Sequence, residues 1–168
     1  INKVGELFEQ KKYFLPQLLM AADSASAAFG FLRAELAKSG VEGEKKGPIV
    51  IATVKGDIHD IGKNIVKVLL ESYGFTVIDL GRAVKPEDVV KAAKDSGCTL
   101  VGLSALMTTT VPAMEETVKL LKENCPHVKT VVGGAVLTEE YAKMIGADKY
   151  AADAMETVRY AEEINAKM

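Results

Sequence analysis

Two aspartates and a histidine form the cluster of side chains in this sequence that is best suited to chemistry. Asp57, His59 and Asp60 lie close together, and His59 is one of only 2 histidines in the chain. An imidazole can bind a metal or exchange a proton, and a carboxylate two residues away can bind its other ring nitrogen and fix its tautomer. Gly62 follows, where a missing side chain would let a large planar ligand approach the backbone. A simpler interpretation also fits, in which both aspartates cap the next helix and His59 is an ordinary loop residue.

Two further segments combine small and hydroxyl-bearing residues. Ser104, Thr108 and Thr110 follow an apolar run, and residues 133–135 read Gly-Gly-Ala after another. Hydroxyl groups can donate hydrogen bonds to a ligand, and paired glycines let the backbone approach one closely. On their own, however, the first segment is also typical of a polar loop and the second of a tight turn.

Each of these segments comes directly after an expected strand. Apolar runs predict strands at 49–54, 76–80, 100–106, 129–132 and 149–151. Helical spacing predicts helices at 61–73, 85–97, 113–124, 138–146 and 154–166. Strict alternation of strands and helices predicts an α/β fold with a five-stranded parallel sheet, Rossmann-like and of the flavodoxin-like order 2-1-3-4-5. Ligands of such sheets bind beyond the carboxyl ends of the strands, so the candidate segments should meet at that edge.

The N-terminal region has a different pattern. Residues 1–39 show helical spacing without strand-like runs, and Phe8, Leu15 and Leu18 can meet on one side of a helix pair. We expect a helical cap at 1–39, a polar and glycine-rich linker at 40–47 and the α/β domain at 48–168. Ordinary helix packing would also explain the three apolar side chains. Because the chain begins without Met and in the middle of a pattern, we expect it to be a piece of a longer protein.

Composition excludes several classes of function. The 168 residues are 48% hydrophobic and 26% charged, with a net charge of -2, which suits one soluble domain with a small appendage. Without a basic excess we expect no nucleic-acid partner. Without an apolar run of about 18 residues we expect no membrane span. With 2 cysteines and 2 histidines far apart, a zinc site is not expected, and reduced thiols indicate the cytoplasm.

The motifs resemble those of a known family. Asp57-x-His59-x-x-Gly62 resembles the cobalamin-binding signature D-x-H-x-x-G, and segments 102–110 and 133–135 resemble the same family in the right order. Segments 4–8 and 13–17 are similar to its helical cap, so the resemblance covers nearly the whole chain. The run 56–66 is very similar to the corrinoid region of cobalamin-dependent methionine synthase, and also to the small corrinoid proteins of methanol and methylamine methyl transfer. The cap of that family is a four-helix bundle, whereas this chain has room for about two helices, so its cap looks incomplete.

The resemblance implies specific roles for the residues. His59 would be the lower axial ligand of cobalt, in place of the cofactor's own dimethylbenzimidazole tail. Asp57 would bind the other imidazole nitrogen, and Thr110 would extend this relay where methionine synthases often have Ser. Ser104 and Thr108 would line the slot that buries the tail. The residues that the resemblance places around cobalamin are Gly56, Asp57, Ile58, His59, Asp60, Ile61, Gly62, Ser104, Leu106, Thr108, Gly133, Gly134, Ala135 and, from the cap over the opposite corrin face, Phe8, Leu15 and Leu18.

The implied function is methyl transfer through cobalamin, with methylcobalamin as the resting methylated state. We expect a cobalamin-dependent methyltransferase module of methionine synthase, which carries a methyl group to homocysteine. Its partners would be methyl-donor and methyl-acceptor domains or subunits and a reductive reactivation partner. Alternatives are a separate corrinoid protein for methanol or methylamine methyltransferases, a cobalamin sensor without catalysis, a mutase domain, or a receiver-like module without a cofactor.

Overall fold

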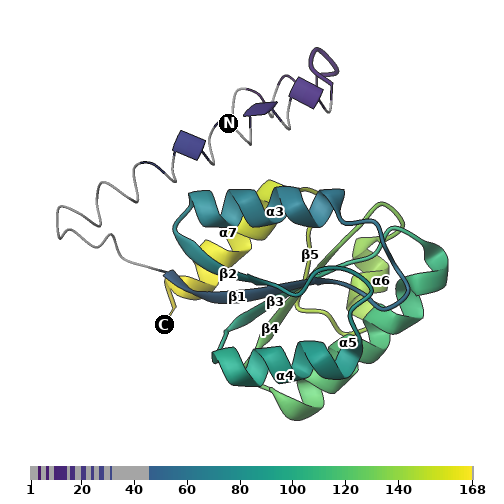
Figure 1. Ribbon diagram of the computed structural model, residues 1–168. Helices are drawn as coiled ribbons and strands as arrows, with labels where there is room; N and C mark the ends of the chain where they lie inside the picture. The colour runs from purple at the N-terminus through teal and green to yellow at the C-terminus, as the bar shows by residue number, and fades with distance from the viewer. Residues whose placement is uncertain are drawn as a thin grey trace, which may run out of the picture.

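The computed structural model describes residues 4, 7, 10–14, 16–17, 20–21, 24, 27–28, 31 and 46–167. In the continuous part, five strands and five α-helices alternate along the chain (Figure 1). The strands are β1 (Lys46–Thr53), β2 (Phe75–Asp79), β3 (Leu100–Ser104), β4 (Lys129–Gly133) and β5 (Lys149–Tyr150). The helices are α3 (Ile61–Ser72), α4 (Pro86–Ser96), α5 (Val111–Asn124), α6 (Glu139–Met144) and α7 (Ala154–Asn165), and a 3-10 turn, η1 (Thr108–Thr110), precedes α5.

The strands form one parallel sheet in the order β2-β1-β3-β4-β5. This confirms the flavodoxin-like order predicted from the sequence. The central strands β1 and β3 are apolar because both of their faces are covered by helices. All carboxyl ends of the strands therefore lie along one edge of the sheet.

Two apolar cores lie on opposite faces of the sheet. Figure 1 shows α3 and α7 over one face and α4 and α5 over the other. On the α3/α7 face, Leu70 and Val158 pack against Ile51 and Val131 of the strands. The core of the α4/α5 face is larger and also contains residues of α6, with members such as Val50, Leu103, Met114, Val118 and Ile145.

Helix ends follow the expected chemistry. Pro86 is the first residue of α4, two acids lie in its first turn, and Gly97 closes it in the left-handed conformation at φ 62°. The side chains of Thr138 and Asp153 cap α6 and α7 by accepting hydrogen bonds from backbone amides. These local signals explain why the predicted helix bounds agree closely with the observed ones.

Two strand bounds differ from the prediction by more than one residue. β1 begins at Lys46, inside the expected linker, where the Lys46 ammonium binds Glu162 at 2.9 Å and lies 5.0 Å from the centre of the Phe75 ring. β3 ends at Ser104 instead of Leu106, because the chain turns there toward η1. The division into a cap at 1–39, a linker and a domain from 48 stays a prediction.

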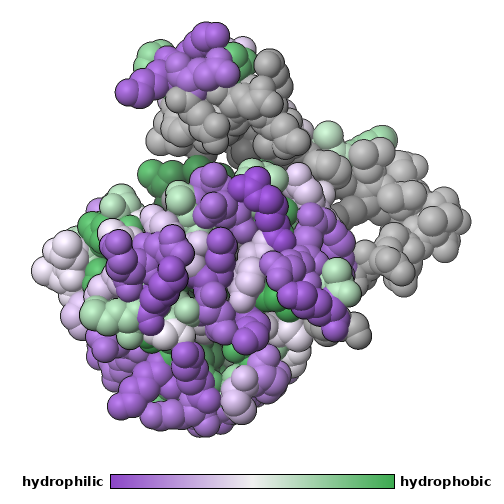
Figure 2. Space-filling model, turned by 180° about the vertical axis from the view of Figure 1, so that it is seen from behind, coloured by the Kyte–Doolittle hydropathy of each residue, from purple (hydrophilic) through white to green (hydrophobic). Residues whose placement is uncertain are grey.

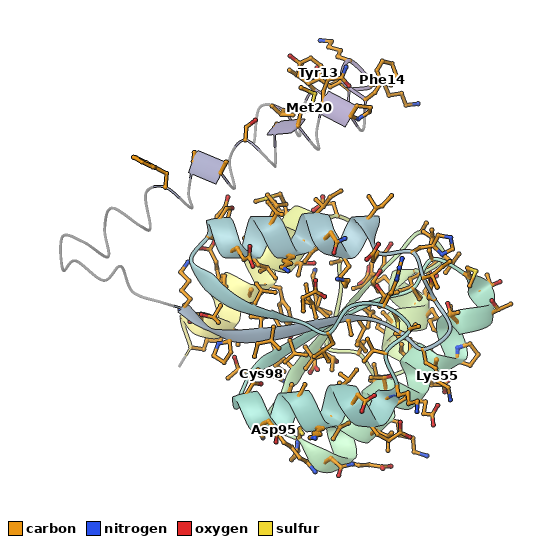
Figure 3. The ribbon with its side chains drawn as sticks, in the orientation of Figure 1. Tyr13, Phe14, Met20, Lys55, Asp95 and Cys98 are labelled. Carbon is orange, nitrogen blue, oxygen red and sulfur yellow. The ribbon has the colours of Figure 1, made fainter. Side chains whose placement is uncertain are left out.

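Described positions before residue 46 include a turn at residues 10–12 and helical positions among 16–31. Phe14, Met20 and Phe31 are exposed, and Figure 3 shows Phe14 and Met20 away from the sheet. From behind, the α/β part has a mainly hydrophilic surface with small separate hydrophobic areas (Figure 2). Among the residues that the structure describes, no helix is both long and apolar enough to cross a membrane.

Candidate functional site

The predicted site segments meet at the carboxyl edge of the sheet. The loop 54–60 follows β1, residues 80–85 follow β2, residues 105–107 follow β3 and residues 134–138 follow β4. Lys55 marks this edge in Figure 3, and Cys98 lies on the opposite side of the molecule. The second histidine, His127, precedes β4 and therefore lies toward the other edge.

The Asp57 carboxylate is the centre of the site. It is fully buried, and its Oδ1 accepts hydrogen bonds from the His59 amide at 3.0 Å and from the His59 ring nitrogen Nδ1 at 2.8 Å. Its Oδ2 accepts from the amides of Leu106 and Met107 at 2.7 and 3.2 Å. The Thr110 hydroxyl lies 2.9 Å from Oδ2 and 2.8 Å from the Met107 carbonyl, so these two oxygens share its single proton.

These hydrogen bonds decide the charge of Asp57. Burial alone would raise the pKa of its carboxyl group, but the hydrogen bonds from His59, Leu106 and Thr110 outweigh burial and hold that pKa well below its usual range. Asp57 is therefore a buried anion, which can accept a hydrogen bond from a ring nitrogen that carries a proton.

The orientation of His59 follows from this anion. A carboxylate only accepts hydrogen bonds, so Nδ1 carries the proton that lies between the two side chains. In the neutral ring the other nitrogen, Nε2, then presents a lone pair. Among the described residues Nε2 has no hydrogen-bond partner, and the His59 side chain is 45% exposed. The arrangement suits a metal ligand whose tautomer is fixed by a carboxylate.

The simpler interpretation, in which the aspartates cap the next helix, is wrong for this structure. Asp60 occupies the N-cap position of α3, but its side chain makes no capping hydrogen bond. Asp57 instead binds the loop after β3 and so joins two strand ends.

The backbone around Asp57 is also held from the loop after β2. The amide of Ala83 donates to the Asp57 carbonyl at 2.9 Å, and Ala83 has φ 54°, which an L-residue rarely adopts. Sequence reasoning did not find Ala83, nor the amides of Leu106 and Met107, because a backbone donor leaves no mark in the residue type.

A buried ion pair joins the first turn of α3 to the end of β2. Lys63, in the first turn of α3, binds Asp79 at the end of β2 at 2.5 Å, and its side chain is only 3% exposed. Asp79 also accepts from the Gly81 amide at 2.9 Å. Burial raises the pKa of Asp79, but hydrogen bonds from Lys63 and Gly81 and the charges of Lys63 and Lys67 lower it more, so it lies below its ordinary value. Sequence analysis assigned no role to this pair.

Exposed apolar side chains occur in the same segments as the imidazole and its partners. Ile58 and Ile61 are 61% and 57% exposed, and Leu106 is also exposed. No atom of the described residues lies within 4 Å of the place that a Cβ at Gly62 would occupy, and the φ of Gly62 is not in the left-handed region. Neither backbone conformation nor packing therefore requires glycine at this position. The space that a side chain would fill here is open to a ligand.

The hydroxyl and glycine segments occupy neighbouring strand ends. Ser104 pairs with Gly133 across β3 and β4, and Thr108 and Ala135 are exposed. Gly134 has a structural reason of its own, since a Cβ there would lie 1.8 Å from the Ala105 carbonyl oxygen and its φ is +143°. Phe8, Leu15 and Leu18 lie outside the described residues, so the predicted cover of the opposite face stays a prediction.

These features fit cobalamin. A single imidazole cannot build a metal site from protein ligands alone, but it suits a cobalt whose equatorial ligands come from a corrin ring. The exposed apolar side chains and the open space at Gly62 suit the face of that large ring. Among the described residues, the Thr53 hydroxyl is buried without a hydrogen-bond partner, in the strand next to Ser104.

Comparisons with known proteins agree with this chemistry. A family model described as "B12 binding domain" matches residues 47–159, and a second model with the same description matches residues 1–33. Dimethylamine corrinoid protein 2 of Methanosarcina acetivorans is 48% identical over 98% of this chain and 76% of its own length.

Solved structures are similar over nearly the whole chain. A cobalamin-binding protein from Desulfitobacterium hafniense is 35% identical over 96% of this chain and 76% of its own, with a TM-score of 0.81. The methanol:cobalamin methyltransferase complex of Methanosarcina barkeri matches at 33% identity and a TM-score of 0.82, over 98% of this chain and 63% of that one. The chain therefore belongs to the B12 binding domain family, among the cobalamin-binding corrinoid proteins of methyltransferase systems.

Proposed function

We propose that this chain carries a methyl group on cobalamin as a separate corrinoid protein that serves a methyltransferase for methylated amines. The observation that carries this proposal is the Asp57–His59 pair, which presents a free Nε2 at the carboxyl edge of the sheet. The donor class is supported by relatives named dimethylamine corrinoid proteins, which are 45–48% identical over 98% of the chain. This support favours the separate corrinoid protein over the methionine synthase module expected from the sequence.

Bound cobalamin supplies the cobalt that carries the methyl group. His59 would hold that cobalt through Nε2. Asp57 keeps the proton on Nδ1, and the amides of Leu106 and Met107 keep Asp57 charged and fixed. If Nε2 took up a proton, the same carboxylate would stabilise the imidazolium. Ile58, Ile61 and Leu106 would exclude water from the lower side of the ring.

Spectroscopy of one histidine variant tests this ligand assignment. His59→Gly should shift the visible spectrum of bound methylcobalamin, because the lower ligand changes from imidazole to water or none. His127→Gly is the matched control, since it removes the other histidine without touching the carboxyl edge. A His59→Gly protein whose bound cofactor has the spectrum of the parent would show that His59 does not bind the cobalt.

A transfer assay tests the proposed place in metabolism. We expect a dimethylamine methyltransferase and dimethylamine to methylate the cobalt(I) form of the protein, with methylation seen as a spectral change. Homocysteine with a methionine synthase barrel should not demethylate it at a comparable rate. If no methylamine or methanol system methylates the protein while cobalamin stays bound, the sensor alternative gains support. Reductive reactivation of oxidised cobalt would need a further partner in this proposal.

A further inference from the structure

One buried hydroxyl in the sheet has no hydrogen-bond partner. Among buried side-chain nitrogen and oxygen atoms of the described residues, only Thr53 Oγ1 lacks one. Thr53 is 0% exposed, so no bulk water reaches its hydroxyl group. A buried hydroxyl without a partner costs free energy, and valine has nearly the same shape without that cost. The presence of threonine here therefore calls for a partner that the protein chain does not supply.

Strand register places this hydroxyl in a row with two predicted site residues. Thr53 pairs with Ser104 in β3, and Ser104 pairs with Gly133 in β4. Residues paired in register point to the same face of a parallel sheet, and residues two apart along a strand share that face. Ile51 belongs to the core under α3 and α7, so Thr53, Ser104 and Gly133 lie on the α3/α7 face at the carboxyl edge.

The row is open at one end and closed at the other. Ser104 and Gly133 are partly exposed, whereas Thr53 is fully enclosed. A ligand group that enters beside Gly133 and Ser104 would reach Thr53 next. None of the three residues brings a large side chain that would block such a group.

We infer that Thr53 donates a hydrogen bond to the nucleotide tail of cobalamin, and so helps the protein prefer cobalamin with a complete tail. This inference rests on the proposed function, in which His59 takes the place of the tail base on cobalt. The displaced base then carries a ring nitrogen whose lone pair has lost its partner. The protein has a buried donor without an acceptor, and the ligand brings a buried acceptor without a donor. Joining them satisfies both groups and requires no change of charge.

The experiment compares binding of cobalamin and of cobinamide, which lacks the tail, to the ligand-free protein by absorbance titration. Thr53→Val should weaken cobalamin binding roughly 5- to 100-fold, the range for a buried polar group left without its partner. Cobinamide binding should not change. The thermal midpoint of the ligand-free variant should be equal to or higher than that of the parent, because the unpartnered hydroxyl is gone. If Thr53→Val binds cobalamin more weakly but is as stable as the parent, a general structural defect does not explain the weaker binding.

Three controls make the result decisive. Thr53→Ser keeps the hydroxyl and should keep the preference for cobalamin. Thr117→Val replaces a buried threonine of α5 whose hydroxyl already donates to the Ala113 carbonyl at 2.6 Å, and should leave both affinities unchanged. Thr53→Ala removes the hydroxyl again and decides the question if the valine variant does not fold.

Two outcomes overturn the inference in different ways. If Thr53→Val and Thr53→Ala bind cobalamin as tightly as the parent, or lose both ligands equally, then Thr53 does not contact the tail while the proposed function stands. If the parent itself binds cobinamide as tightly as cobalamin, the tail is not buried and the proposed mode of binding fails with it.

Discussion

The two faces of the central sheet end differently at the carboxyl edge. On the α4/α5 face the apolar core continues to the ends of the strands, with Ala52, Leu103 and Val132 followed by Val54 and Ala105. On the α3/α7 face the core stops one row earlier, and the last row holds Thr53, Ser104 and Gly133.

In the proposed function, the same three strands would serve two purposes. Side chains alternate between faces along each strand, so one face can be packed for stability while the other keeps small and polar groups for a ligand. The loop that carries Asp57 and His59 follows β1 at the carboxyl edge, where the row of Thr53, Ser104 and Gly133 ends the strands. Under this proposal, stability and ligand binding are separated by side-chain direction and not by segments of the sequence.

The largest expected effect comes from breaking the packed face. Leu103→Ala would leave a cavity in the α4/α5 core, where Leu103 is fully buried, and should cost about 2–5 kcal/mol of unfolding free energy. Urea unfolding of the ligand-free protein measures this cost. The preference for cobalamin over cobinamide should stay as in the parent. The control is Ser104→Ala, one residue later and on the opposite face, which should cost little stability. If Leu103→Ala altered the preference for cobalamin, the separation of the two faces would be contradicted.

A smaller effect is expected from the ion pair between α3 and β2. Lys63→Met removes a charged hydrogen-bond donor from Asp79 and should cost about 1.5–3 kcal/mol, because Asp79 keeps only the Gly81 amide and the more distant Lys67. Lys67→Met is the matched control on the same helix. Lys67 is 36% exposed and lies 3.4 Å from Asp79, so its loss should cost less than about 1 kcal/mol. Equal costs for the two variants would show that burial of Lys63 does not strengthen the pair.

These comparisons also show what the sequence could and could not predict. The strand order, the helices and the place of the site at the carboxyl edge follow from periodicity and from rules for parallel sheets. The early start of β1 depends on contacts of Lys46 with Phe75 and Glu162, which lie far away in the chain.

The end of β3 and the surroundings of Asp57 could not be predicted for a related reason. Residues 105 and 106 are apolar and read as strand, but the chain leaves the sheet there and brings the amides of Leu106 and Met107 to Asp57. Likewise, the missing partner of Thr53 is visible only once all its neighbours are placed. Residue types indicated Asp57 and His59 as candidates, whereas the backbone partners of Asp57 could be found only from the fold.

Acid should weaken the α3 side of the molecule through Asp79. Its folded pKa lies below the ordinary value of 3.8, so the unfolded chain takes up this proton first as the pH falls. The contribution of Asp79 to stability is therefore complete above 3.8 and is lost as the pH falls through 3.8 toward the folded value. Unfolding free energies at about pH 6 and about pH 3.5 should differ less for Asp79→Asn than for the parent. A variant with the same loss as the parent would show that other carboxylates account for the acid sensitivity.

The smallest expected change in stability is a gain, at Gly62. This residue lies in the first turn of α3, outside the left-handed region, and in the described part of the chain no atom lies within 4 Å of where its Cβ would stand. Gly62→Ala should therefore stabilise the ligand-free protein by up to about 1 kcal/mol, since alanine loses less freedom on folding. The added methyl group would project into the open space at this turn of α3, where the corrin ring would rest in the proposed function. Cobalamin and cobinamide should then both bind more weakly, because both carry the ring, whereas Thr53→Val should affect only cobalamin. A Gly62→Ala protein that gains stability and binds both ligands as the parent does would show that the ring does not rest on this turn of α3.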